Sequence, residues 1–101
     1  MPATFELSGE TARIELSGAL DFSSQDKLDE VIQQALGAAS ARQIDVDLAR
    51  ATFIDSSIIR ALLTLRRVAG AQGTPLTLWN CNTQIREILA IGGFDQLFVL
   101  R

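Results

Sequence analysis

The segment of this chain best suited to chemistry is Asp55-Ser56-Ser57. It lies between a β-like segment that ends at Ile54 and the start of the most apolar helical pattern in the sequence. A helix N-terminus has free backbone N–H groups and a positive dipole end, so serines there commonly serve as N-caps. The same position suits a phosphate, whose oxygens accept those N–H groups and whose charge the dipole favours. Two interpretations are therefore open: a helix cap and a phosphate acceptor.

A second acidic residue, Asp21, also follows a strand-like segment. Because functional sites gather at the carboxyl ends of strands in α/β sheets, we expect Asp21 near Asp55. A phosphate beside two carboxylates would be repelled by both of them, so phosphorylation would change the charge of that surface. The pattern favours a surface switch over a silent modification.

The composition excludes many other kinds of site. The chain has no His, no Tyr and one Cys, so it has no His-based catalytic triad, no His-ligated metal and no internal disulfide. It also lacks the common general base of neutral-pH catalysis, and we expect neither an enzyme nor a bound cofactor or metal. The net charge of -3 argues against nucleic acid as a partner, because phosphate contacts require basic residues.

No apolar run approaches the length of a membrane span, and the first residues show no signal-peptide pattern. We therefore expect a cytoplasmic protein without direct membrane insertion. The charge is unevenly divided: residues 1–50 hold nine acids and four bases, whereas residues 51–101 hold three acids and five bases. This division indicates either two differently solvated halves or an acidic face and an arginine face that meet different parts of a partner.

Hydrophobic periodicity predicts the elements that position these residues. Period-two alternation indicates strands, and apolar residues at i, i+3, i+4 and i+7 indicate amphipathic helices. Ser23 and Asp26 resemble a capping box for the first helix. The expected strands are 4–7, 12–17, 44–48 and 76–79, and the expected helices are 28–39, 57–69 and a short one around 85–89. The apolar tail from Phe94 to Leu100 is expected to be a last short strand or a docked coil.

Strands that alternate with helices in this way predict an α/β fold. We expect one domain over residues 1–101, with a mixed, mostly parallel sheet of four to five strands and helices packed against it. The order is ββαβαβα, with a possible final strand. Crossovers between parallel strands should be right-handed.

These elements and motifs together resemble the STAS domain, the family of bacterial anti-sigma factor antagonists. The resemblance spans nearly the whole chain in the right order. The matching features are Ile14-x-Leu16-x-Gly18-x-Leu20-Asp21, the helix with Leu28 and Ile32, Ile44-x-Val46-x-Leu48, Phe53-Ile54-Asp55-Ser56-Ser57, Leu62-Leu63, Gly73-x-x-Leu76-x-Leu78, and Ile85 to Leu89 before Gly93-Phe94.

The resemblance implies a regulatory binding protein. In the family, an anti-sigma factor that is also a serine kinase phosphorylates the serine after the motif Asp, which here is Ser56. Asp55 and Asp21 flank this serine, and Ser57 fills the Ser/Thr position after it. The unphosphorylated form is expected to bind the anti-sigma factor and free the sigma factor; a phosphatase would reverse the phosphorylation.

One residue departs from the family pattern. Ile58 stands where the family usually has Gly, and we expect its side chain to add bulk beside the docking site. Arg60 begins a polar stripe with Thr64 and Arg67, which is where a partner at Ser56 would next make contact. The departure leaves open a member that binds without being phosphorylated.

Two alternative functions remain open. The first is an interaction subunit of a stressosome-like assembly or of a lipid or anion transport complex. The departure at Ile58 and the apolar segment from Phe94 to Leu100 motivate it. The second is purine-nucleotide sensing, which is reported for some STAS-like domains.

Overall fold

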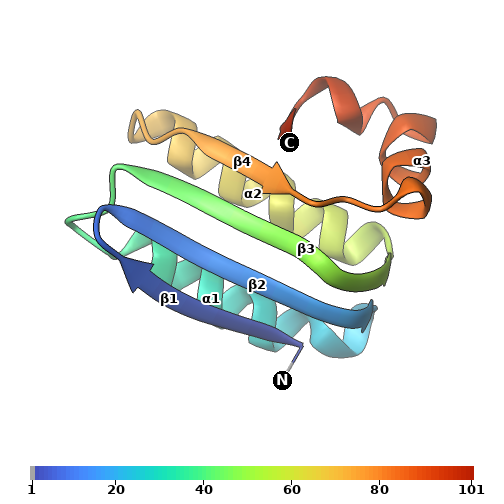
Figure 1. The fold of residues 1–101 in the computed structure, drawn as a ribbon, viewed down its shortest axis with the longest axis horizontal. Coiled ribbons are helices and arrows are strands. Elements are labelled where there is room, and N and C mark those ends of the chain that lie inside the picture. Colours follow the sequence, from blue (N-terminus) through green and yellow to red (C-terminus); the bar gives the residue numbers. More distant parts are fainter. Residues whose placement is uncertain (1) are drawn as a thin grey trace.

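The structure is a computed structural model that describes residues 2–101, so Met1 of the expected 1–101 domain lies outside it. Strands and helices alternate along the chain (Figure 1). This confirms the predicted α/β order, with the optional last strand present. The elements are β1 (Ala3–Ser8), β2 (Thr11–Leu20), η1 (Phe22–Ser24), α1 (Gln25–Leu36), β3 (Gln43–Ile54), α2 (Ser56–Ala71), β4 (Leu76–Trp79), α3 (Thr83–Ile91), η2 (Phe94–Gln96) and β5 (Val99–Leu100), where η marks a 3-10 turn.

The five strands form one mixed sheet in the order β1-β2-β3-β4-β5. β1 and β2 are antiparallel, and the other neighbouring pairs are parallel. The β1–β2 hairpin turns at Gly9, whose φ of 60° is readily adopted by glycine. Gly18 has a φ of 78° and lies at a register shift between β2 and β3. This irregularity sets the course of β2 just before Asp21.

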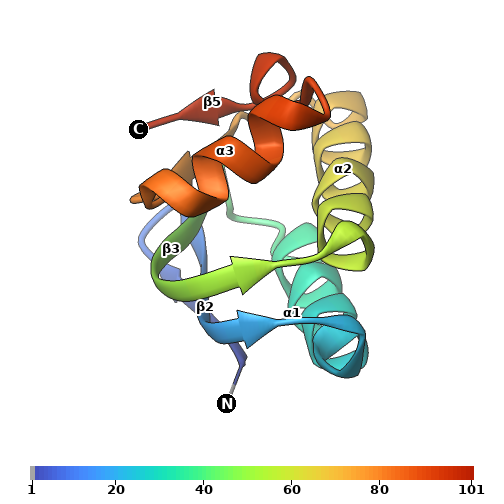
Figure 2. The ribbon, with the colours of Figure 1, turned by 90° about the vertical axis from the view of Figure 1, so that its right-hand side faces the viewer.

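Both long helices cover the same face of the sheet (Figures 1 and 2). The alternation predicted for 12–17 holds, because Ala12, Ile14 and Leu16 are buried on this face. α1 and α2 bury their apolar stripes against it, so the main core lies between sheet and helices. α3 follows β4 and lies beyond the carboxyl end of that strand (Figure 1).

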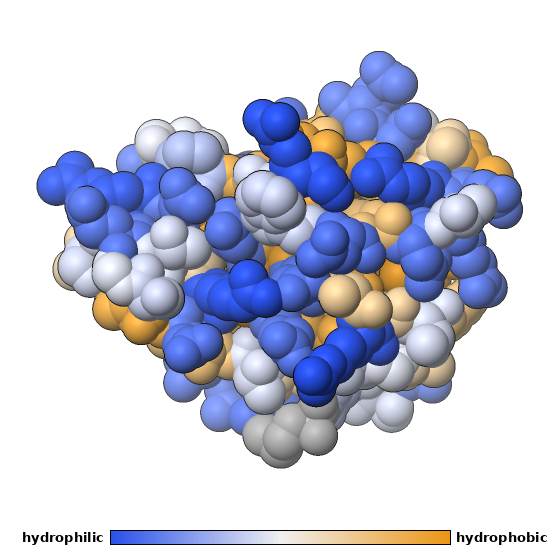
Figure 3. All heavy atoms as spheres, viewed as in Figure 1, coloured by the Kyte–Doolittle hydropathy of each residue, from blue (hydrophilic) through white to orange (hydrophobic). Residues whose placement is uncertain are grey.

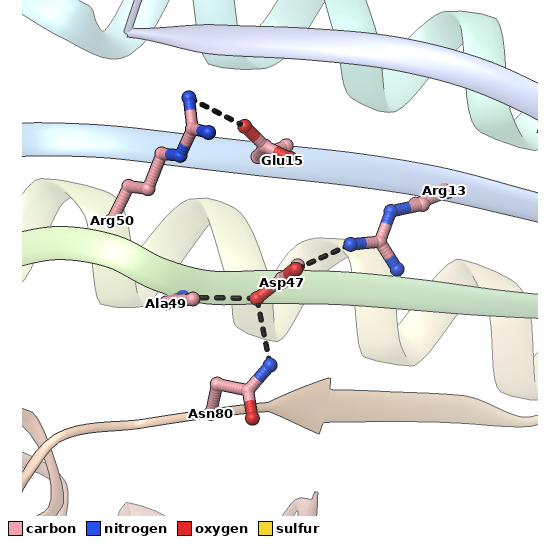
Figure 4. Close-up of polar contacts among 6 residues, drawn as sticks. All are labelled: Arg13, Glu15, Asp47, Ala49, Arg50 and Asn80. Carbon is pink, nitrogen blue, oxygen red and sulfur yellow. Dashed lines mark hydrogen bonds and ion pairs between the residues drawn. The ribbon is translucent and has the colours of Figure 1, made fainter.

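The opposite sheet face carries no helix and displays mostly polar residues (Figures 1 and 3). A polar network there joins β2, β3 and the residue that follows β4 (Figure 4). Asp47 of β3 pairs with Arg13 of β2 and accepts hydrogen bonds from Asn80 Nδ2 at 3.1 Å and from the backbone N–H of Ala49 at 2.9 Å. Although burial by itself would raise the pKa of Asp47, these bonds and the Arg13 charge lower it. Asp47 is therefore held ionised where β2, β3 and β4 meet.

One helix start differs from the sequence expectation. The predicted capping box of Ser23 and Asp26 is wrong: Ser23 lies inside η1, and Ser24 precedes α1 without a side-chain cap. Asp21 caps η1 instead. At α3, Asn82 is the N-cap, and its Oδ1 accepts a hydrogen bond from the backbone N–H of Ile85 at 2.8 Å.

Candidate functional site

The candidate site is built where β2 and β3 end side by side. Leu20 and Ile54 are paired in the parallel register and are the last residues of their strands. Asp21 and Asp55 directly follow them. The backbone N–H of Asp55 donates to the carbonyl of Leu20 at 3.1 Å, which holds the two strand ends together. The sheet thus brings both predicted acids to one edge, as the sequence argument expected.

Asp55 is the N-cap of α2. Its backbone is extended, with φ −103° and ψ −177°, which is usual for an N-cap. Its Oδ1 accepts bonds from the Ser57 hydroxyl at 2.6 Å, the Ser57 backbone N–H at 2.9 Å and the Ile58 backbone N–H at 3.1 Å. The serines therefore are not the caps: Ser56 and Ser57 are the first two residues of the helix.

The same contacts control the charge of Asp55. The hydroxyl of Ser57, with the backbone N–H groups of Ile58, Ser57 and Phe22, lowers the pKa of the Asp55 carboxyl despite its partial desolvation. Asp55 is consequently a fixed negative charge at neutral pH, beside the residue predicted as phosphate acceptor. Ser57 is occupied in holding that charge in place.

Ser56 differs from Ser57 in its surroundings. It is exposed, and its hydroxyl has no hydrogen bond within the described residues 2–101. It borders a hollow of about 190 Å³ that Ile59, Arg60, Leu63 and Phe94 also line. The free hydroxyl lies at the positive end of α2, and an arginine lines the same hollow. A phosphate on Ser56 would meet one fixed carboxylate, a helix dipole and a cation.

Asp21 caps the 3-10 turn η1 with hydrogen bonds like those that Asp55 accepts at α2. Its Oδ1 accepts bonds from the backbone N–H of Ser23 at 2.9 Å and from the Ser23 hydroxyl at 2.5 Å. Each of the two acids thus accepts hydrogen bonds from the serine two residues later in the chain. Asp21 is exposed and adds a second carboxylate at the edge where Ser56 lies.

The structure corrects the expectation for Ile58. Its side chain is fully buried in the core, with no exposed surface, so it adds no bulk to the surface around Ser56. Helix periodicity explains this: Ile58, Leu62 and Leu65 recur at i, i+4 and i+7 on the face of α2 turned to the sheet. Arg60 is exposed, as expected for the polar stripe.

Two aromatic residues at this edge were missed from the sequence. Phe22, directly after Asp21, is 76% exposed, and Phe53, near the end of β3, is 39% exposed. Aromatic side chains are enriched at protein–protein interfaces, so these two exposed rings are candidate partner contacts. Their position in the sequence could have indicated this exposure, because each lies near the end of a strand, outside the run of alternating residues that forms the core.

Residues 2–101 contain no cluster of His, Cys, Asp and Glu that would hold a metal ion. No helix in this part of the chain is both long and apolar enough to cross a membrane. The site consists of two acids that cap helices, the exposed hydroxyl of Ser56 and two exposed aromatic rings.

Comparison with known proteins decides the family. The sequence model of the family described as "Mlab, STAS domain" matches residues 3–101. The chain belongs to the STAS domain family. A STAS-domain containing protein of Pseudomonas aeruginosa (strain UCBPP-PA14) is 37% identical over 90 residues, which are 89% of this chain and 87% of that protein.

Solved structures share the STAS fold at lower identity. SpoIIAA of Bacillus, whose structure is described as that of an anti-sigma factor antagonist in its unphosphorylated form, is 23% identical with a TM-score of 0.75. The match covers 98% of this chain and 86% of that one. Its phosphorylated form matches with the same TM-score over 98% and 90% of the two chains. A sulfate transporter family protein of Wolinella succinogenes is 19% identical, with a TM-score of 0.78 over 94% and 80%.

Proposed function

We propose that this STAS domain is an anti-sigma factor antagonist that is switched off by phosphorylation at Ser56. Its partners are an anti-sigma factor that acts as a serine kinase and a serine phosphatase that restores the free form. The protein is then a substrate and a binder rather than an enzyme, and it regulates sigma-factor-dependent transcription in the cytoplasm. The similarity to the SpoIIAA fold, solved in both states, supports this assignment.

One observation carries the choice of Ser56. Of the two serines that follow Asp55, only Ser56 has an exposed hydroxyl without a partner in residues 2–101, whereas Ser57 donates to Asp55. A kinase needs an accessible hydroxyl, and phosphorylation of Ser57 would break the cap of α2. With Ile58 buried, no bulky side chain from that position obstructs access to Ser56.

The switch is electrostatic. The partner surface includes Asp21, Asp55 and the exposed rings of Phe22 and Phe53, with Arg60 beside the hydroxyl. A phosphate adds a charge of about -1.5 to -2 at neutral pH. On a surface that already holds two carboxylates, this charge raises the cost of desolvation when a partner covers the site, so the complex dissociates.

The test compares Ser56 with Ser57. The wild type, Ser56→Ala and Ser57→Ala are incubated with ATP and the serine kinases of the ATPase type from the same organism, and the modified residue is mapped by mass spectrometry. Calorimetry measures the affinity of the same kinases for wild type and Ser56→Asp. We expect phosphate on Ser56 only and an affinity at least about tenfold weaker for Ser56→Asp. Phosphate on Ser57, or no phosphate together with unchanged affinity, would exclude the proposal.

The second candidate function is an interaction subunit of a stressosome-like or membrane transport complex, without phosphorylation. Its support is the family description "Mlab, STAS domain" and the fold shared with a sulfate transporter family protein. Purification of the tagged protein from its native cells distinguishes the two. A permease or transport ATPase in stoichiometric amount, in a complex that survives Ser56→Asp, favours the second. Nucleotide sensing is tested by calorimetry with GTP and ATP.

A further inference from the structure

A second hollow lies away from Ser56, between α2 and the C-terminal segment 97–99. This α2 groove has a volume of about 730 Å³ and is lined by neither Ser56 nor Asp55. Its apolar lining consists of Leu63, Leu76, Leu97, Phe98 and Val99, and its basic lining consists of Arg60, Arg66 and Arg67. Leu97 and Val99 are 41% and 50% exposed, so apolar surface is open to solvent inside the groove.

The three arginines of the groove are unneutralised. Four cations of the described residues form ion pairs with acids, and none of the four is on α2. Arg60, Arg66 and Arg67 have no acidic partner within 4 Å in residues 2–101. In a chain with a net charge of -3, the α2 groove is therefore a local basic site.

The groove wall is fixed by a polar contact. The Nε of Arg66 donates to the backbone carbonyl of Leu97, which ties the C-terminal segment to α2. Arg60 and Arg67 are seven residues apart on one helix face, so they are separated by about 10 Å along the axis. Both are exposed.

This spacing decides the kind of occupant. A small anion is bound by donors that converge on one point, whereas these guanidinium groups start about 10 Å apart along α2. The exposed apolar lining would stay uncovered by an inorganic ion. A helix that carries acidic residues seven positions apart places its carboxylates at the same interval and its apolar face between them. Charge complementarity thus favours an amphipathic acidic helix.

We infer that the α2 groove is a second docking surface, which binds an acidic amphipathic helical segment of a partner protein. The inference does not require phosphorylation of Ser56, because neither Ser56 nor Asp55 lines the groove, although Arg60 and Leu63 line both hollows. Arg60 and Arg67 contact the acids of the partner, and the side chains of Leu97 and Val99 pack against its apolar face.

Selection from a peptide library tests this inference, because the library itself supplies the candidate helices. A displayed library of random 16-residue peptides is selected on the wild-type protein and counter-selected on Arg60→Glu/Arg67→Glu. Both substituted positions are exposed, so the variant should fold, and circular dichroism checks this. Arg42→Glu/Arg50→Glu is the matched control, because it changes the charge equally outside the groove. Vesicles of phosphatidylglycerol are assayed with the same proteins.

We expect enriched peptides rich in Asp, Glu and Leu, with acids seven apart. Their affinity should fall at least about tenfold in Arg60→Glu/Arg67→Glu and with rising salt, but not in Arg42→Glu/Arg50→Glu. Val99→Ser should weaken the affinity of these peptides as well. Binding of a peptide to the wild type should shift the amide NMR signals of Leu63 and Val99. Peptides that are basic or bind both targets equally, an absence of enrichment, or vesicle binding abolished by the groove variant would overturn the inference.

Discussion

At the scale of single residues, the site depends on one carboxylate oxygen. Asp55 Oδ1 accepts three hydrogen bonds at the start of α2, two of them from backbone N–H groups that have no partner inside the helix. It therefore stabilises the helix and, at the same time, leaves Ser56 outside its hydrogen bonds. The structural role and the proposed functional role belong to neighbouring residues.

Removal of this cap should be measurable. Asp55→Ala should lower the free energy of unfolding by about 1 kcal/mol, and Asp55→Ser should recover most of it, because serine also caps helices. Urea denaturation at neutral pH measures both. Asp29→Ala on the exposed side of α1 is the control and should change stability by less than about 0.5 kcal/mol. Equal losses in all three variants would contradict the capping role.

Ile58 provides the opposite case, a residue that departs from the family pattern for reasons of packing. Ile58→Gly should destabilise the protein by about 4 kcal/mol, because it removes a fully buried side chain and puts glycine into a helix. Thermal unfolding measures the loss. Val68→Gly, at a partly buried position of the same helix, should cost less. If Ile58→Gly instead retained its stability and bound the kinase more tightly, Ile58 would be a docking residue.

At the scale of elements, Asp47 of β3 links β2 to the residue that follows β4, across the sheet face that lacks helices (Figure 4). Its pKa is lowered in the folded state, so the ionised form stabilises the fold above the ordinary carboxyl pKa. That stabilisation is lost as pH falls from the ordinary carboxyl pKa of about 4 through the lower pKa of the folded state.

Substitution of Asp47 should show this dependence. Asp47→Asn should cost roughly 1 to 2 kcal/mol at pH 7 and progressively less below pH 4, so wild type and variant converge in acid. Urea titrations at pH 7, 4 and 2.5 measure the difference. Asp45→Asn, on the same strand, should lose much less, because within residues 2–101 the Asp45 side chain accepts hydrogen bonds from Gln43 alone. A difference independent of pH would show that the charge of Asp47 is not what joins the strands.

At this scale, the sequence predicts the elements better than it predicts their caps and their contacts with one another. Periodicity located α1, α2 and the strands because their apolar spacing reflects burial on one side. The N-cap was not determined, since Asp and Ser cap helices about equally well and Asp55-Ser56-Ser57 offers three candidates. The burial of Ile58 was within reach of the same periodicity. The groove was not, because it requires the C-terminal segment to fold back onto α2, a contact between residues 31 positions apart.

At the scale of the whole molecule, the two proposed surfaces adjoin each other along α2, where Arg60 and Leu63 line both hollows. The edge with Ser56 lies at the carboxyl ends of β2 and β3, and the α2 groove follows the same helix toward Gly70. α2 belongs to both and packs on the sheet through its buried face. A charge placed at its first residue therefore acts on the surface without any need to repack the core.

The fold should accordingly stay unchanged when that charge is introduced. Ser56→Asp should raise the free energy of unfolding by about 0.3 to 1 kcal/mol, because an anion at a helix N-terminus is favoured by the dipole. Its amide shift changes should be confined to the start of α2 and the ends of β2 and β3. Two-dimensional NMR and urea denaturation measure both effects.

Ser57→Asp is the matched control, with the same added charge one residue later. It removes the hydroxyl that donates to Asp55 and places a second carboxylate against the first, so it should destabilise the protein by about 1 kcal/mol. The contrast separates a charge that the fold accommodates from one that it opposes. Shift changes from Ser56→Asp that extend to β1 or α1 would instead indicate a switch that works by changing the conformation of the whole domain.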